Sequence, residues 1–210
     1  MVWTVFFVRK LFQRVYICIL LLVMVWCGSF LSDKKQLAQD LIRFHVVANS
    51  DDAEDQRQKL LVKDAVVNSL QQTMGQMPDS TQARQYLREH LPEIQELANQ
   101  TLQMAGSTCS AAVSLCRETF DTRFYDTFSL PAGVYDALRI TIGEGEGHNW
   151  WCVAFPTLCL PATSEGFQEV SAEAGLSGTL EKTLAGEEGY EIRFFLLDQL
   201  GKLENHFFEP

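Results

Sequence analysis

The chain has 210 residues, enough for one domain of ordinary size with a short appendage. Its 17 basic and 27 acidic residues are unevenly placed, because three of the basic residues and none of the acidic ones lie in residues 1–31. Residues 32–210 therefore carry a net charge of −13. Such an acidic domain argues against nucleic acid and against anionic membrane surfaces as partners, but it does not identify what the domain binds.

An apolar segment occupies the N-terminus. Arg9, Lys10 and Arg14 precede residues 15–31, VYICILLLVMVWCGSFL, which contain no charged side chain. A membrane span needs about 20 apolar residues, with a lower limit of about 17. Residues 1–31 are therefore predicted to be a signal peptide or a transmembrane signal-anchor helix, and the sequence leaves its cleavage open. The basic residues on its N-terminal side orient the rest of the chain outside the cytoplasm, either secreted or membrane-anchored.

Residues 32–40 are predicted to be a short polar linker, followed by an exported domain over 41–210. In residues 41–48, apolar side chains alternate with Arg43 and His45, a period of two that indicates a strand. Asp51 and Glu54 form a capping-box pattern at the start of the helix that follows.

That first helix is predicted to end near Gly75 and Pro78. Asp79 is predicted to cap a second helix, which Pro92 kinks or restarts and Gly106 ends.

From residue 108 the apolar pattern changes to alternation, which predicts a strand to about residue 120 and a loop over 121–135. A second strand with Leu138, Ile140 and Ile142 leads into 143–149, GEGEGHN, which we interpret as a hairpin turn before a returning strand.

Residues 162–189 are predicted to be a flexible insertion, and 190–203 fit a strand or a helix, with a helix from about 191 favoured. The order of elements predicts an α+β fold, with helices packed on one face of an antiparallel sheet.

Four cysteines lie in the exported domain. Cys152 and Cys159 flank Pro156, and a chain that turns there would bring them together, so we predict a disulfide between them. Two reduced, buried cysteines are the alternative. Cys109 and Cys116 would pair only if the chain bends between them.

Polar residues cluster where the first strand meets the first helix. His45 and Asp51 would suit a base and its orienting carboxylate, but the chain has no G-x-S-x-G nucleophile motif. The spacing of His45, Asp51 and Asp55 fits no common metal site, and nothing in the sequence predicts a metal or a cofactor. A structural role for His45 is favoured over catalysis, so these residues alone leave the function open.

Several stretches resemble the stage II sporulation protein R family. They are IRFHVVANSDDAEDQRQKLLVKDAV (42–66), LPAGVYDALRITIGEGEGHNWWCVAFPTLC (130–159), YEIRFFLLDQL (190–200) and the N-terminal apolar segment. The first is the most specific, because R-x-H-V-x-A-N-S-D followed by E-D-Q is not a generic pattern.

The resemblance implies a signalling protein rather than an enzyme, with no small-molecule substrate. A protein of this family is exported from the forespore into the space between the forespore and mother-cell membranes. There it activates a membrane-embedded aspartic-type protease, which processes pro-sigma-E in the mother cell. The alternatives are an extracytoplasmic hydrolase acting at His45 and Asp51, and an anchored structural protein of the envelope.

Two patches are candidate contacts for the protease. One is the junction of strand and helix, with Arg43, His45, Asn49, Ser50, Asp51, Asp55 and Gln56. The other contains Arg139, Trp150 and Trp151, residue types that often anchor interfaces. The competing interpretation of the two tryptophans is that one faces the core and the other covers a sheet edge.

Overall fold

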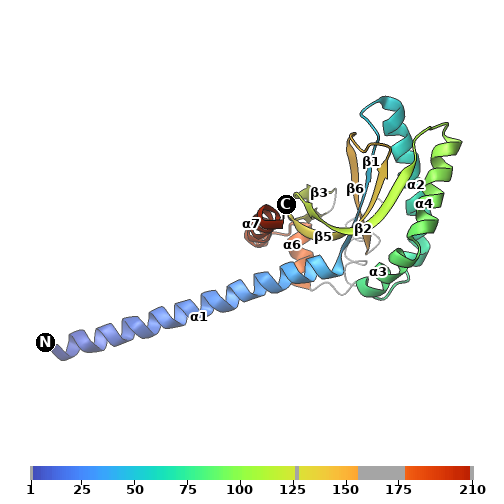
Figure 1. Ribbon diagram of the computed structural model, residues 1–210. Coiled ribbons are helices and arrows are strands. Elements are labelled where there is room, and N and C mark those ends of the chain that lie inside the picture. The colour runs from blue at the N-terminus through green and yellow to red at the C-terminus, as the bar shows by residue number, and fades with distance from the viewer. Residues whose placement is uncertain (1, 126–127, 156–177, 209–210) are drawn as a thin grey trace.

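The computed structural model describes residues 2–125, 128–155 and 178–208 (Figure 1). The elements are, in chain order, α1 (Val2–Asp40), β1 (Ile42–Val47), α2 (Ala53–Met74), α3 (Ser80–Glu89), α4 (Leu91–Met104), β2 (Ala111–Phe120), β3 (Arg123–Phe124), β4 (Ser129–Leu130), β5 (Gly133–Ile142), β6 (Asn149–Phe155), α6 (Gly178–Ala185) and α7 (Glu191–Phe208). The fold is α+β, as predicted.

The main sheet has four strands in the order β2-β5-β1-β6. β1 pairs with β5 in parallel and with β6 antiparallel, and β2 pairs with β5 antiparallel. The prediction of a wholly antiparallel sheet is therefore wrong. β5 and β6 do not form a hairpin, because β1 lies between them: Val47 has Thr141 of β5 on one side and Asn149 of β6 on the other.

Helices cover both faces of this sheet, not one face as predicted (Figure 1). On the first face, Ile42, Phe44 and Val46 pack in a core with α2, α3 and α4. On the second face, a separate core joins the sheet to the end of α1, α6 and α7. Every residue of β1 is buried as a consequence, including the polar residues of its second face.

α1 extends away from the domain over most of its length, and only its last turns reach the sheet (Figure 1). Residues 32–40, predicted to be a linker, belong to this helix, with Leu37 buried in the second core. In the part of the chain that the structure describes, no helix combines the length and the apolar character that a membrane span requires. The role of residues 1–31 stays a prediction.

The ends of the helices test the predicted caps. Asp79 accepts hydrogen bonds from the amides of Thr81 (2.8 Å) and Gln82 (2.9 Å), which confirms it as the cap of α3. α4 restarts with Pro92 in its first turn, also as predicted. The capping box at α2 is wrong: Asp52 holds the cap position, and its side chain makes no capping bond.

The C-terminal segment is the helix α7, as favoured, with Leu197 buried. The predicted loop 121–135 contains the short strands β3 and β4, which pair with each other. The predicted insertion contains α6, and its first part, 162–177, lies outside the described residues.

Of the cysteines, Cys109 and Cys116 are free and Cys152 is disulfide-bonded. Cys159 lies outside the described residues, so the pairing of Cys152 with Cys159 stays a prediction.

Candidate functional site

The turn between β1 and α2 is held by a network of side-chain hydrogen bonds. Asp55 Oδ2 accepts from Asn49 Nδ2 at 2.8 Å and from Ser50 Oγ at 2.6 Å. These two bonds, led by the one from Ser50, lower the pKa of Asp55. Gln56 Nε2 donates to the backbone oxygen of Ser50 at 2.9 Å. The network therefore ties the first turn of α2 back to the end of β1.

The same turn supports the loop that connects β5 to β6 across the end of β1. Asn49 Oδ1 accepts from the amide of Glu144 at 3.0 Å, and the Asn49 backbone oxygen accepts from the amide of Glu146 at 3.1 Å. The amide of Gly147 donates to the backbone oxygen of Ala48 at 3.0 Å. Asn49 thus joins two segments that are nearly a hundred residues apart in the chain.

At two positions of this loop only glycine fits, because the loop lies too close to the turn between β1 and α2 to leave room for a side chain. A Cβ at Gly147 would lie 2.2 Å from the backbone oxygen of Ser50. Gly143 has φ +57°, and a Cβ there would lie 2.1 Å from Asn49 Oδ1. The glycines of GEGEG therefore serve a tertiary contact rather than a tight hairpin turn.

An exposed acid–imidazole pair lies at the surface of this junction. Asp51 Oδ1 accepts from the amide of His148 at 2.7 Å and lies 2.5 Å from its ring nitrogen Nδ1. The hydrogen bond to the His148 ring lowers the pKa of Asp51. The side chains of Asp51 and His148 are 55% and 82% exposed. Below them, Lys59 Nζ donates to the backbone oxygen of His148 at 2.9 Å.

Arg43 points to the other side of the junction, into the second core, and is 0% exposed. Its guanidinium carbon lies 4.4 Å from the centre of the Phe120 ring and 5.4 Å from that of Tyr135. Nη2 donates to the hydroxyl of Tyr125 at 3.2 Å, whereas Nε and Nη1 have no hydrogen-bond partner among the described residues. Burial lowers the pKa of Arg43.

His45 is also buried, at 2% exposure, and its ring stacks on Trp151 with 4.8 Å between ring centres. His45 Nε2 lies 2.9 Å from Glu118 Oε2, and Arg139 Nη1 lies 3.4 Å from Glu118 Oε1. Burial opposes ionisation of Glu118, but the close contact with His45, the hydrogen bond from the Cys116 thiol and the charge of Arg139 outweigh it and lower its pKa to about 2. Glu118 is therefore a carboxylate at neutral pH.

The predicted contact residues separate into three groups. Asn49, Ser50, Asp51, Asp55 and Gln56 meet in the turn. Arg43, His45, Arg139 and Trp151 lie together on the second face of the sheet. Trp150 packs on the first face against Phe44, at 5.8 Å between ring centres. Trp150 therefore packs against the first core and Trp151 against the second. In this arrangement, burial keeps Arg43 and His45 from touching a partner directly.

His45 and Asp51, the base and orienting carboxylate considered for hydrolysis, do not contact each other. His45 contacts Glu118 and Asp51 contacts His148, so the proposed base and its orienting carboxylate belong to different clusters. Burial also raises the pKa of the Cys116 thiol, which keeps it protonated and weakly nucleophilic. No cluster of three or more His, Cys, Asp or Glu side chains suitable for a metal ion occurs among these residues.

Two residues of the site were not predicted from the sequence: Glu118, which contacts His45, and His148, which contacts Asp51. His148 ends the glycine-rich loop, and only the crossing over β1 brings it to Asp51. Glu118 lies on β2, whose register with β5 decides that it faces Arg139 and His45. Neither relation has a local sequence signal.

The family comparison covers this whole arrangement. The model of the family described as stage II sporulation protein R matches residues 38–165. This range contains β1 to β6, the turn with Asp51 and the buried group around His45. A curated relative, the stage II sporulation protein R of Bacillus subtilis (strain 168), is 33% identical over 181 residues, covering 77% of this chain and 80% of the relative. No solved structure matches the chain.

The chain belongs to the stage II sporulation protein R family, and its role is in sporulation. The predicted resemblance is therefore confirmed. The family is named for this role and not for an enzymatic activity.

Proposed function

We propose that this protein is an exported signal that activates a membrane-embedded aspartic-type protease, which then processes pro-sigma-E in the mother cell. Membership of the stage II sporulation protein R family carries the proposal. The apolar N-terminal segment supports export into the space between the forespore and mother-cell membranes. The acidic character of residues 32–210 is compatible with a domain that works outside the cytoplasm.

Activation requires that the signal bind an active form of the protease more tightly than an inactive form, since equal binding shifts no equilibrium. The exposed pair of Asp51 and His148 is the part of the junction best placed for such a contact. The hydrogen bonds of Asn49 to Asp55 and to the loop fix the backbone beneath the pair. A surface that is ordered before binding loses less conformational entropy on docking.

The alternative hydrolase is disfavoured by the separation of His45 from Asp51 into different clusters. An enzyme at this junction would lose turnover in His45→Ala while still binding its partner. A purely structural envelope protein would have no effect on the protease.

Co-expression in a non-sporulating bacterium tests the proposal. The cells would contain the membrane protease and pro-sigma-E from the same host, with or without this protein exported. We expect pro-sigma-E to be shortened only when the protein is present. Equal cleavage in both strains, with the protein exported and folded, would refute the function.

The contact itself is tested by Asp51→Asn, which preserves the shape of the side chain and removes its charge. We expect processing to fall at least tenfold while the thermal unfolding midpoint falls only slightly, because an ion pair this exposed contributes little to stability. Asp64→Asn, which changes an exposed carboxylate on α2, is the matched control and should process normally. A loss of processing that only follows a loss of folded protein would assign Asp51 to stability instead.

A further inference from the structure

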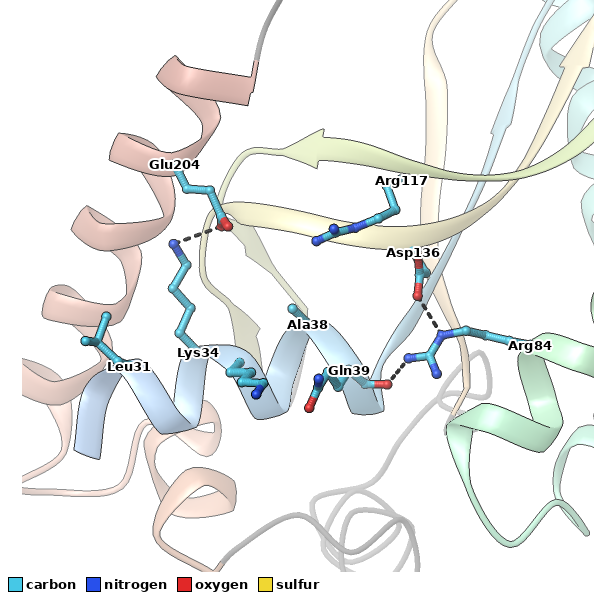
Figure 2. Close-up of a pocket in the computed structure, with 9 residues that line it drawn as sticks. Leu31, Lys34, Ala38, Gln39, Arg84, Arg117, Asp136 and Glu204 are labelled. Atoms are coloured by element: carbon cyan, nitrogen blue, oxygen red, sulfur yellow. Dashed lines mark hydrogen bonds and ion pairs between the residues drawn. The ribbon is translucent and has the colours of Figure 1, made fainter. Parts of the chain in front are cut away.

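A cavity of about 610 Å³ lies away from the junction, between the last turns of α1, the strands β2 and β5, and the helices α3 and α7 (Figure 2). Its charged lining consists of Lys34, Lys35, Arg84, Arg117, Asp136 and Glu204. The volume is within the range of about 300–1,000 Å³ that is usual for small-molecule sites.

Ion pairs account for half of the cations in the lining. Lys34 Nζ lies 2.9 Å from Glu204 Oε2, and Arg84 Nε lies 2.5 Å from Asp136 Oδ2. Arg84 also donates to the backbone oxygen of Gln39. Both carboxylates of the lining are thus neutralised.

The other two cations, Arg117 of β2 and Lys35 of α1, have no ion pair among the described residues. Figure 2 shows the Arg117 side chain extending from its strand toward the side of the cavity where Glu204 lies, without a dashed line to any of the residues drawn. Its guanidinium carbon lies 5.9 Å from the centre of the Phe208 ring. The cavity therefore holds two surplus positive charges in a domain whose net charge is −13.

We propose that this cavity binds a phosphate-bearing anion, with Arg117 and Lys35 as its principal ligands. Both Arg and Lys form charge-assisted hydrogen bonds with phosphate. A phosphate group has oxygens in several directions, so it can accept hydrogen bonds from Arg117 of β2 and from Lys35 of α1 at the same time. A carboxylate fits this pair less well, because a single guanidinium already satisfies both of its oxygens.

The phosphate has two possible sources. Leu31 lines the cavity and ends the apolar run 15–31, whose side chains Leu20, Leu22 and Met24 are exposed. If that run enters a membrane, the cavity lies at the height of the lipid headgroups. A small phosphate ester in solution would present the same chemistry.

The solution source is tested by calorimetric titration of the full chain in a non-ionic detergent with glycerol 1-phosphate and with inorganic phosphate, at constant ionic strength. We expect saturable binding that Arg117→Gln and Lys35→Gln each weaken at least tenfold. Arg117→Lys keeps the charge and should weaken binding only a few fold. Arg88→Gln removes an exposed cation of α3 outside the cavity and should bind like the parent.

The lipid source is tested with the full chain in nanodiscs of phosphatidylcholine, with and without phosphatidylglycerol. The readout is the rate at which an amine-reactive reagent labels Lys35, followed by peptide mass spectrometry. Slower labelling with phosphatidylglycerol, reversed by glycerol 1-phosphate and absent in Arg117→Gln, assigns a lipid headgroup. Equal labelling in both discs, together with saturable binding in solution, assigns a soluble phosphate.

Absence of saturable binding in solution and of protection in the nanodiscs overturns the proposal. An equal loss of binding in Arg88→Gln and Arg117→Gln also overturns it, because the attraction would then be general and not local to the cavity. The measurements use the isolated chain, so their result is independent of pro-sigma-E processing.

Discussion

Replacing Glu118 by Gln removes the carboxylate that contacts His45, Arg139 and the thiol of Cys116. The fold lowers the pKa of Glu118 from its ordinary value of 4.5 to about 2. This difference corresponds to about 3 kcal/mol of folding free energy at neutral pH. The side chain is only 20% exposed, so solvent screens little of it. Because the pKa is depressed in the fold, the stabilisation is complete above pH 4.5 and is lost as the pH falls toward 2.

The assay is chemical denaturation of the full chain and of Glu118→Gln between pH 7 and pH 3. The parent should exceed the variant by about 3 kcal/mol at pH 7 and by about 1.5 kcal/mol at pH 3. Glu96→Gln, an exposed change on α4, is the control and should match the parent throughout. A difference between parent and Glu118→Gln that stays constant over this pH range would refute the reasoning, since the loss would then come from packing and not from charge.

Three further changes test the architecture by the free energy of unfolding. Gly147→Ala should cost about 2 kcal/mol, because its Cβ would lie 2.2 Å from the backbone oxygen of Ser50; an unchanged value would mean that the loop moves freely. Asp79→Ala should cost about 1 kcal/mol through loss of the α3 cap, and a neutral result would show that water replaces it. Arg43→Met should be neutral or stabilising by about 1 kcal/mol, because two guanidinium nitrogens of Arg43 are buried without a hydrogen-bond partner among the described residues. A large loss of stability would show that the contact of Arg43 with Phe120 outweighs the cost of burying those nitrogens.

The alternation in β1 correctly separated Arg43 and His45 from Ile42 and Phe44. It did not reveal that the second face is buried as well, because Arg and His usually mark the solvent side of a strand. The covering elements are the end of α1, α6 and α7, which come from opposite ends of the chain. No local period in residues 41–48 carries information about them. The burial of Arg43 was therefore beyond a sequence-only argument.

The mixed sheet was missed for a related reason. β5 and β6 are separated by six residues that include three glycines, and such a segment favours a hairpin. The same glycines also suit a loop that crosses the end of another strand. What distinguishes the two cases is the approach of Gly147 to Ser50, which is a contact between distant parts of the chain. The helix restart at Pro92 and the cap at Asp79 are local features, and both were predicted correctly.

The signature R-x-H-V-x-A-N-S-D now divides into two physical roles. Arg43 and His45 project into the second core, and Asn49 joins the turn to the crossing loop, so these residues determine the shape of the junction. Asp51 differs from them because its carboxylate faces solvent beside His148. Changes at His45 or Asn49 should lower stability and the proposed signalling together, whereas a change at the exposed Asp51 should affect the proposed signalling far more than stability. A motif specific enough to identify the family therefore does not by itself identify a binding surface, since most of its side chains hold the fold that presents one.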